Sequence, residues 1–255
     1  MTTVNDIYEV INKIAPFSMQ ESYDNSGIIV GSGGKEVNRI LLALDITKSV
    51  AEEAAENGFD LVISHHPVIF TGLKNLSPDN PAVILSKNDI NAICMHTNFD
   101  IAKGGMNDIL CQKLGLVPIE PLAEENGVSI GYVCDCKEEY MPKALAEKVK
   151  KSLGNKVVRY VDTEKPIKRI AVCSGSGGSF LPFAINKEID AYITGDIKHD
   201  VFIDAYNNDI CLMDAGHYYT ENIFFEFVKN KLTKKYPMLD IYTADSNKDI
   251  TAYEI

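Results

Sequence analysis

Apolar residues at the start of the chain recur at helical spacing. Val4, Ile7, Val10 and Ile11 share one helical face, which predicts an amphipathic helix over residues 4–15 that ends before Pro16. Short apolar runs then alternate with further helical patterns. Strands are expected at residues 39–45, 60–64 and 91–96, and helices at residues 49–57, 81–87 and 106–114. This alternation predicts largely parallel sheets with helices on both faces.

The pattern of the first half returns in the second half. VNRILLALDIT at residue 37 resembles IKRIAVCSGSG at residue 167, and NGFDLVISHH at residue 57 resembles KEIDAYITGD at residue 187. Both pairs have a spacing of 130, since 169 − 39 and 190 − 60 give the same number. NAICMHTN resembles NDICLMDAG at a spacing near 117, and LGLVPIEPLAEENGVSIGYV resembles YPMLDIYTADSNKDITAYE. Four matches in one order predict an internal duplication, with similar α/β domains at residues 1–133 and 134–255.

The composition is that of a water-soluble globular protein. The chain has 255 residues, of which 45% are hydrophobic and 24% are charged. No apolar run is long enough to cross a bilayer, and the first residues lack the apolar region of a secretory signal. Six cysteines lie mostly in apolar runs and form no CxxC pair, which predicts reduced thiols in the core. We therefore expect a cytoplasmic protein without membrane attachment.

The net charge of −11 argues against direct binding of nucleic acids. Binding to a phosphate backbone needs clustered Lys and Arg side chains. The one basic cluster, residues 143–156, follows a helical pattern that also carries Glu147. A solvated helix face explains this cluster, so we expect no direct nucleic-acid partner.

All five histidines follow predicted strands. His65 and His66 come after DLVIS, His96 after NAICM, His199 after AYIT and His217 after ICLMD. In open α/β sheets, ligands bind at the edge formed by the carboxyl ends of the strands. Histidines placed by packing alone would not be confined to one edge. The placement predicts a functional site there.

Two carboxylates near these histidines complete a set of metal ligands. Glu221 lies four residues after His217, so both project from one helix face, although such a pair is also typical of an ordinary first helical turn. Asp100 lies in HTNFD, where it could equally cap a turn. The neighbours His65 and His66 cannot easily share one ion, but each can bind one ion of a pair roughly 3.5–4 Å apart. Three imidazoles and two carboxylates therefore predict two divalent ions per chain, of zinc, manganese, iron or nickel.

Residues 174–179, SGSGGS, form a glycine-rich segment between a predicted strand and a short helix. Backbone N–H groups of such a turn can bind phosphate. The segment lacks the full GxGxxG pattern and the Walker lysine, so a tight structural turn is an equal alternative.

Seven stretches of the sequence resemble one known family. They are YDNSGIIVG at 23, LDIT at 44, SHHPVIF at 64, HTNFDIAKGGMND at 96, SGSGG at 174, TGDIKHD at 194 and GHYYTE at 216. Together they span nearly the whole chain and resemble the Nif-three family, whose bacterial members are named GTP cyclohydrolase I type 2 homologues. Tyr23 departs from the family, which usually has tryptophan there.

The resemblance implies two α/β domains and a dinuclear metal site. The family's ligands carry over onto five residues of this chain: His65, His66, Asp100, His217 and Glu221. The resemblance also implies a homohexamer and a small-molecule substrate such as a nucleotide.

The family's name implies a GTP cyclohydrolase, which opens the guanine imidazole ring with release of formate. Such a reaction needs a proton shuttle, for which His96 and His199 are the candidates. Two alternatives stay open at this point. One is a metal-dependent phosphoesterase or nucleotidase, because dinuclear sites recur in phosphate chemistry. The other is a metal-binding scaffold or regulator without catalytic activity.

Overall fold

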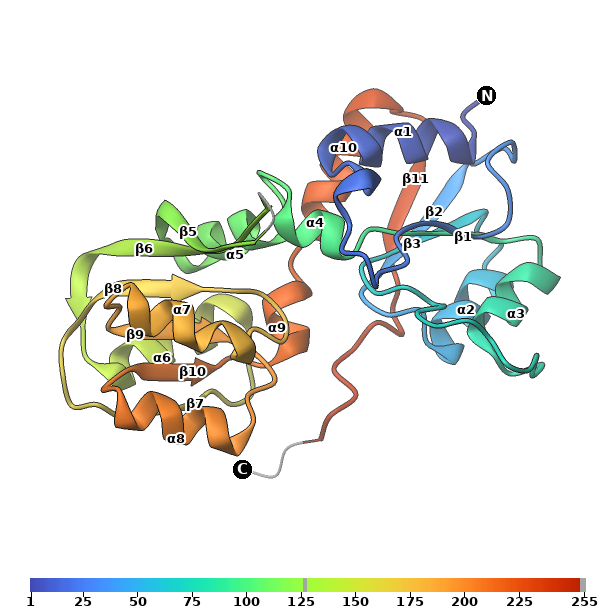
Figure 1. The fold of residues 1–255 in the computed structure, drawn as a ribbon. Coiled ribbons are helices and arrows are strands. Elements are labelled where there is room, and N and C mark those ends of the chain that lie inside the picture. The colour runs from blue at the N-terminus through green and yellow to red at the C-terminus, as the bar shows by residue number, and fades with distance from the viewer. Residues whose placement is uncertain (126–127, 253–255) are drawn as a thin grey trace. The chain divides into compact units, whose positions relative to one another are not determined.

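Two sheets organise the chain, one in each of two α/β units (Figure 1). The structure is a computed structural model that describes residues 1–125 and 128–252. The first unit comprises Met1–Ala102 and Phe224–Ile250, and the second consists mainly of Lys103–Ile223. Mixed α/β units with helices around each sheet are what the alternating sequence pattern predicts.

The first unit contains a five-stranded sheet. Its strands, in spatial order, are β1 (Gly27–Val30), β4 (Asn91–Cys94), β3 (Leu61–Ser64), β2 (Arg39–Ala43) and β11 (Asp240–Thr243). All neighbours are parallel except β1, which runs antiparallel to β4. The helices of this unit are α1 (Val4–Ile14), η1 (Phe17–Met19), α2 (Lys48–Glu56), α3 (Pro81–Lys87), α4 (Thr97–Ile101) and α10 (Phe225–Lys235).

Helices cover both faces of the first sheet, α2 and α3 on one face and α1 and α10 on the other (Figure 1). Every residue of β3 and β4 is buried, as expected for parallel strands between two helical layers. On the α2 and α3 face, Leu41 and Val62 belong to one apolar cluster with Val50 and Leu85. The expected helices and strands of this half are observed to within two residues at each end.

The second unit contains a six-stranded sheet. Its strands, in spatial order, are β5 (Val117–Glu125), β6 (Val128–Tyr140), β8 (Ile167–Val172), β9 (Ala191–Thr194), β10 (Cys211–Asp214) and β7 (Arg159–Tyr160). Its helices are α5 (Met106–Leu114), α6 (Pro142–Leu153), η2 (Gly178–Phe180), α7 (Leu181–Asn186), α8 (His199–Asn207) and α9 (His217–Glu221). Separate apolar clusters join the sheet to α5 and α6 and to α7 and α8.

The second sheet is mixed rather than largely parallel. β8, β9 and β10 are parallel, whereas β5, β6 and β7 pair antiparallel with their neighbours. Only residues 126 and 127 lie between β5 and β6. A parallel pair requires a long crossover, so two strands this close in the sequence can pair only in the antiparallel direction. The expectation of mostly parallel strands therefore holds for the first sheet and for the centre of the second.

The two sheets repeat one strand order, which agrees with the predicted internal duplication. The order β1-β4-β3-β2 of the first sheet corresponds to β7-β10-β9-β8 of the second. Asp60 accepts hydrogen bonds from two successive backbone N–H groups at the start of β2, and Asp190 does the same for β8. The two aspartates lie 190 − 60 = 130 positions apart, the spacing seen in the sequence.

The third sequence match is three positions out of register with the structure. Leu61 pairs with Asn91, and the equivalent Ala191 pairs with Cys211. β4 and β10 are therefore 211 − 91 = 120 positions apart, whereas the match of NAICMHTN with NDICLMDAG predicted a spacing near 117. The short helices α4 and α9 have the same spacing, because they begin at residues 97 and 217, and 217 − 97 = 120.

The units do not divide where the sequence predicted, at residues 133 and 134. The chain leaves the first unit after Ala102 and returns to it after Ile223, 223 − 102 = 121 positions later. Hence α5 and β5 join the second unit, whereas α10 and β11 join the first. α5, which belongs to the first repeat, therefore packs in the second unit. α10, which belongs to the second repeat, packs in the first unit. The fourth sequence match does not mark equivalent strands, since β11 pairs with β2 but β5 pairs with β6.

All six cysteines are free and buried, as predicted. Burial is the main cause that raises the pKa of Cys136 to about 11 and that of Cys211 to about 12. These thiols stay protonated near neutral pH, which suits a packing role.

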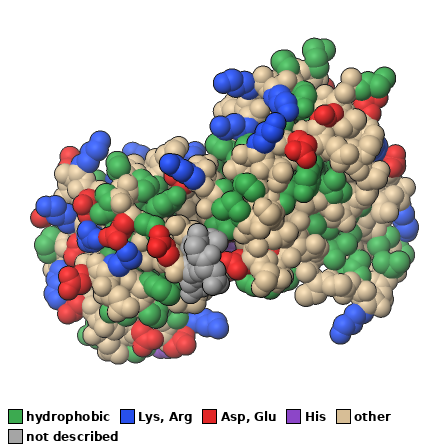
Figure 2. All heavy atoms as spheres, turned by 45° about the horizontal axis from the view of Figure 1, so that its top comes forward, with side chains coloured by type: hydrophobic (Ala, Val, Ile, Leu, Met, Phe, Trp, Pro, Cys, Tyr) green, Lys and Arg blue, Asp and Glu red, His purple; other side chains and the backbone are tan. Residues whose placement is uncertain are grey.

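The basic cluster lies on α6, where Leu145 and Val149 are buried and Lys143 and Lys150 are exposed. It is thus the solvated face of an amphipathic helix. On the face shown in Figure 2, basic and acidic side chains are interspersed. Within residues 1–125 and 128–252, no helix is both long and apolar enough to span a membrane.

Candidate functional site

Three histidines of the first unit lie at the carboxyl edge of its sheet. His65 and His66 directly follow β3, and His96 follows β4 after one intervening residue. Because β3 and β4 are parallel neighbours, their carboxyl ends meet. The ring centroids lie 5.0 Å apart for His65 and His66, 5.3 Å for His65 and His96, and 5.5 Å for His66 and His96. One nitrogen from each ring lies within 4.8 Å of the others, so the three rings form a possible metal-binding group.

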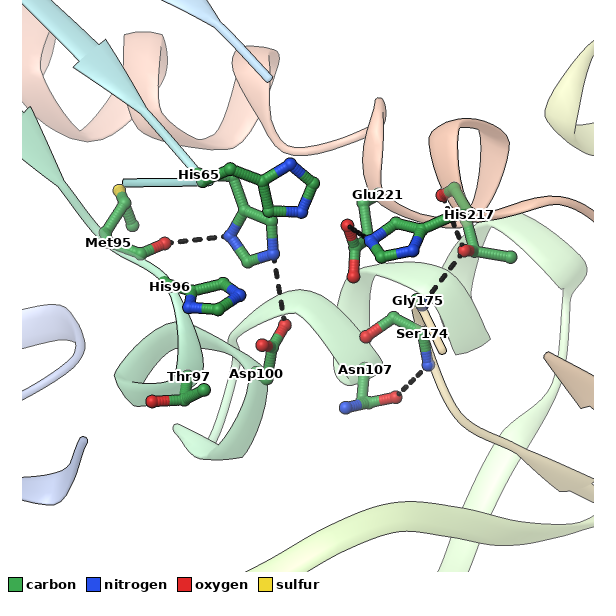
Figure 3. A network of polar contacts seen from close by, with 12 residues as sticks. His65, Met95, His96, Thr97, Asp100, Asn107, Ser174, Gly175, His217 and Glu221 are labelled. Carbon is green, nitrogen blue, oxygen red and sulfur yellow. Dashed lines mark hydrogen bonds and ion pairs between the residues drawn. The ribbon is translucent and has the colours of Figure 1, made fainter. Parts of the chain in front are cut away.

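The Nδ1 atom of each of these rings is held by an oxygen. His65 Nδ1 lies 2.8 Å from the carbonyl oxygen of Met95 (Figure 3). His66 Nδ1 lies 2.7 Å from Asp45 Oδ1, and His96 Nδ1 lies 2.7 Å from Asp24 Oδ1. A carbonyl or a carboxylate can only accept, so Nδ1 must donate its proton. Nε2 is then the atom of each ring that can bind a cation, as in metal sites whose histidines are oriented by oxygens.

Asp100 faces the buried ring of His65. α4 carries this aspartate, and Asp100 Oδ1 lies 3.4 Å from His65 Nε2 (Figure 3). With its proton on Nδ1, a neutral His65 ring would present the Nε2 lone pair to the carboxylate. Two such atoms repel unless a proton or a cation lies between them. Two ligands bound to one ion at about 2.1 Å with a tetrahedral angle are roughly 3.4 Å apart, so the pair fits a divalent ion.

Asp24 organises the loop beside His96, and sequence reasoning missed it. Its side chain is fully buried. Besides His96 Nδ1, it accepts hydrogen bonds from the backbone of Asn25 and Thr97 and from the hydroxyls of Ser26 and Thr97. Burial alone would raise the pKa of Asp24, but the hydrogen bonds from His96 and Thr97 outweigh it and hold this pKa well below its usual range. The YDNSG motif contained the signal, because an aspartate followed by Asn and Ser is typical of a tight polar turn.

The second unit places His217 and Glu221 on one face of α9. This helix has five residues, of which His217 is the first and Glu221 the last. His217 Nε2 lies 2.8 Å from Glu221 Oε2, and Nδ1 lies 2.7 Å from Asp196 Oδ2. Burial lowers the pKa of His217, but the hydrogen bonds to Asp196 and Glu221 prevail and raise it to about 10. Two carboxylates around one imidazole thus favour a positive charge at this position, which either a proton or a metal ion can supply.

The glycine-rich segment lies against this histidine–glutamate pair. Gly175 has a φ of +61°, and a Cβ atom there would lie 2.2 Å from Glu221 Oε1 and 3.4 Å from His217 Nε2. The position therefore needs glycine for two reasons, its left-handed backbone and the close approach of the carboxylate. No other residue would leave Glu221 where it lies.

Three backbone donors of this segment already have protein partners. Ser174 N–H donates to Asn107 (Figure 3), Gly175 N–H to Thr220 Oγ1 and Gly177 N–H to Thr194 Oγ1. These three groups are used to fix the turn, so the arrangement favours a structural turn over a phosphate cradle.

The duplicate of the histidine pair has a different role. Gly195 and Asp196 stand 130 positions after His65 and His66. A Cβ atom on Gly195 would lie 2.6 Å from the backbone nitrogen of His217, so no side chain fits at that position. Asp196 instead accepts the hydrogen bond from His217. One repeat thus supplies imidazoles, and the other supplies a carboxylate that orients an imidazole.

His199, a candidate proton shuttle, is the exposed first residue of α8. It belongs to none of the possible metal-binding groups found among the described residues. His96 differs, because its ring lies beside His65 and His66. The shuttle role of either histidine stays a prediction.

Comparison with known proteins places these residues in a family. A family model described as Duf34/NIF3 (NGG1p interacting factor 3) matches residues 2–250. A Clostridium perfringens protein named GTP cyclohydrolase 1 type 2 homolog is 37% identical over 228 residues, which cover 86% of each chain. A Helicobacter pylori protein named GTP cyclohydrolase 1 type 2 is 39% identical over 233 residues, which cover 88% of this chain and 89% of that protein.

Solved structures share the fold over nearly the full length. A hypothetical protein of Staphylococcus aureus superposes with a TM-score of 0.91 at 27% identity and covers 99% of both chains. A structure titled reduced HcgD from Methanocaldococcus jannaschii superposes with a TM-score of 0.84 at 30% identity, covering 96% of this chain and 98% of that one.

Proposed function

Because the chain belongs to the Duf34/NIF3 family, we propose that it is a metal-dependent hydrolase of a small molecule. Its metal ligands would be five residues, namely His65, His66, Asp100, His217 and Glu221. The proposal is for two divalent ions per chain, because the adjacent histidines suit separate ions better than one.

The observation that carries the proposal is the shared arrangement of the imidazoles. His65, His66 and His217 each direct Nδ1 to an oxygen at 2.7 or 2.8 Å, which reserves Nε2 for a ligand. A histidine that only packs would also need a partner for Nδ1, so the distinguishing feature is what lies beside Nε2. Carboxylates lie beside Nε2 of His65 and His217, so each pair offers nitrogen and oxygen to one cation.

The donor set restricts the ion. Imidazole nitrogens with carboxylate oxygens suit zinc, manganese, iron or nickel, whereas calcium prefers oxygen ligands alone. All six thiols are buried in the core, so none of them competes as a ligand.

Bound ions would supply Lewis acidity for hydrolysis. His96 is the residue of this chain best suited to move a proton. Asp24 holds its Nδ1, so Nε2 would accept or donate the proton, and the carboxylate would stabilise the ring while it is positively charged. Without this partner the ring could rotate or adopt the other tautomer.

The names of the relatives favour hydrolytic opening of the guanine ring of GTP, with formate as a product. Turnover and metal content can be measured on one preparation. Elemental analysis of protein purified without chelators should find about two ions per chain, and incubation with GTP should release formate. Release of inorganic phosphate instead would indicate a phosphoesterase. Full metal content without turnover on a nucleotide panel would indicate a scaffold.

The variant Glu221→Ala tests the ligand set directly. It should lose at least one ion per chain, because it removes one of the two proposed carboxylate ligands. Glu226→Ala, which removes a glutamate nearby in the sequence that is outside the proposed ligand set, is the matched control and should keep both ions. Unchanged metal content in Glu221→Ala would exclude Glu221 from the ligand set. The predicted homohexamer can be tested on the same samples by light scattering.

A further inference from the structure

Two exposed aromatic rings lie beside the histidine group of the first unit. Tyr23 is 64% exposed and Phe70 is 47% exposed. Their ring centroids are 6.4 Å apart with an interplanar angle of 51°. Phe70 in turn lies edge-on to His96, at 6.0 Å and 79°. A continuous row of rings therefore runs from Tyr23 through Phe70 to His96.

The backbone that carries these two rings is held firmly. Asn25 Nδ2 donates to the carbonyl oxygen of Ile69 at 2.6 Å, which ties the loop of Tyr23 to the loop of Phe70. Asp24, directly after Tyr23, is fixed by its hydrogen bonds to His96 and Thr97. Large apolar rings on fixed loops lose little conformational freedom when they bind a ligand.

The other exposed aromatic side chains of the described residues lack this setting. Tyr242 packs against Phe59 and under the guanidinium of Arg39. Tyr206 lies on α8 and, within the described residues, packs against no other aromatic ring. Within residues 1–125 and 128–252, only Tyr23 and Phe70 combine exposure with a position beside possible metal ligands.

We propose that Tyr23 and Phe70 form a stacking subsite for a planar heteroaromatic ring of the substrate. The proposal deepens the proposed function and rests on it. Tilted aromatic faces attract a flat π-system, and such stacking tolerates different ring substituents. A ring bound there would lie next to His96, the residue proposed to move a proton. The subsite would thus select flat, ring-containing substrates over aliphatic ones.

The chain contains no tryptophan, which permits a site-specific probe. Tyr23→Trp would place one indole in the subsite, and Tyr206→Trp would place one on α8 as the matched control. Guanosine and adenosine serve as planar probes, and ribose as the probe without an aromatic ring. The nucleosides should quench the indole fluorescence of Tyr23→Trp saturably, whereas ribose should not, and quenching in Tyr206→Trp should remain unsaturated. Equal quenching in both variants would overturn the proposal.

Phe70→Leu in the Tyr23→Trp protein tests the second ring. Loss of one stacking partner should weaken nucleoside binding by roughly 5- to 150-fold. Metal content and oligomeric state should stay unchanged, because Phe70 contributes neither a ligand nor a subunit contact in this proposal. Unchanged affinity, or a changed oligomeric state that points to a subunit interface, would overturn it. The two proposals can fail separately. If the protein binds no metal ion, the metal centre is refuted, and saturable quenching by that protein would still support the stacking subsite.

Discussion

His65 Nε2 and Asp100 Oδ1 face each other at 3.4 Å, while the opposite nitrogen of the same ring donates to the carbonyl oxygen of Met95. The ring is fully buried, so its orientation is fixed by packing as well as by this hydrogen bond. A nitrogen lone pair and a carboxylate kept at such a distance are complementary to a cation.

The first prediction concerns the variant Asp100→Asn. Its amide keeps the size of the carboxylate and can donate a hydrogen bond to His65 Nε2, so the metal-free variant should remain folded. Affinity for zinc should fall by more than the roughly 10–100-fold that loss of an outer partner causes, because a charged ligand is removed. Competition with a chromogenic chelator measures this affinity. A variant that binds zinc as tightly as the parent would exclude Asp100 from the ligand set.

The second prediction separates two roles of His96. If His96 transfers a proton, His96→Gln should retain its metal and lose turnover by roughly 10²–10⁴-fold. If the ring only supports its neighbours, metal affinity should fall first, by roughly 10–100-fold. Metal content and rate must be measured on the same preparation. His199→Gln tests the other candidate shuttle by the same two measurements. Full metal content with full activity in His96→Gln would eliminate both roles of His96.

The third prediction concerns Gly175. The methyl group of an alanine at this position would collide with the carboxylate of Glu221. Gly175→Ala should displace the carboxylate and lower metal affinity by roughly 10–100-fold, as other changes that misorient ligands do. Part of any loss of stability would come from the left-handed backbone, at roughly 1–2 kcal/mol.

Gly154→Ala isolates this backbone effect. Gly154 has a φ of +76°, but a Cβ atom there would meet no atom within 4 Å. This control should therefore lose stability and keep its metal. Equal metal affinity in the two variants, measured by isothermal titration, would show that the approach of Gly175 to Glu221 has no part in metal binding.

The fourth prediction is a pH dependence of stability that arises from buried thiols. Burial raises the pKa of Cys211 from its usual value near 9 to about 12. The unfolded chain thus loses this proton at lower pH than the folded chain. The stabilising contribution is fully present below pH 9 and is lost as the pH rises toward 12, with a limiting slope of about 1.4 kcal/mol per pH unit for one group.

Urea unfolding at mildly and strongly alkaline pH, from about 8 to about 11, can detect this contribution. Cys211→Ala should be less stable at the lower end of this range, because a buried sulfur is removed, but its stability should decline less steeply as the pH rises. Parallel slopes for the parent and the variant would show that Cys211 is not buried as a protonated thiol.

The sequence alone determined the elements and the chemistry of the candidate site. Apolar spacing predicted helices such as α3 and α5 with their observed ends, because a helix buries one stripe and its period is visible in the residues. The position of His65, His66 and His96 after predicted strands indicated the carboxyl edge. The HxxxE spacing predicted that His217 and Glu221 share a face, since positions four apart always do so in a helix.

Only the tertiary structure decided how the repeats are assembled. α5 and α10 each pack in the unit formed by the other repeat, a choice made by interactions between distant residues. The same holds for the partners that orient the imidazoles. Asp24 lies 72 positions before His96, and Asp196 lies 21 positions before His217. Local sequence patterns do not predict these aspartate–histidine pairs, because the two residues of each pair are distant in the sequence and meet only in the folded chain.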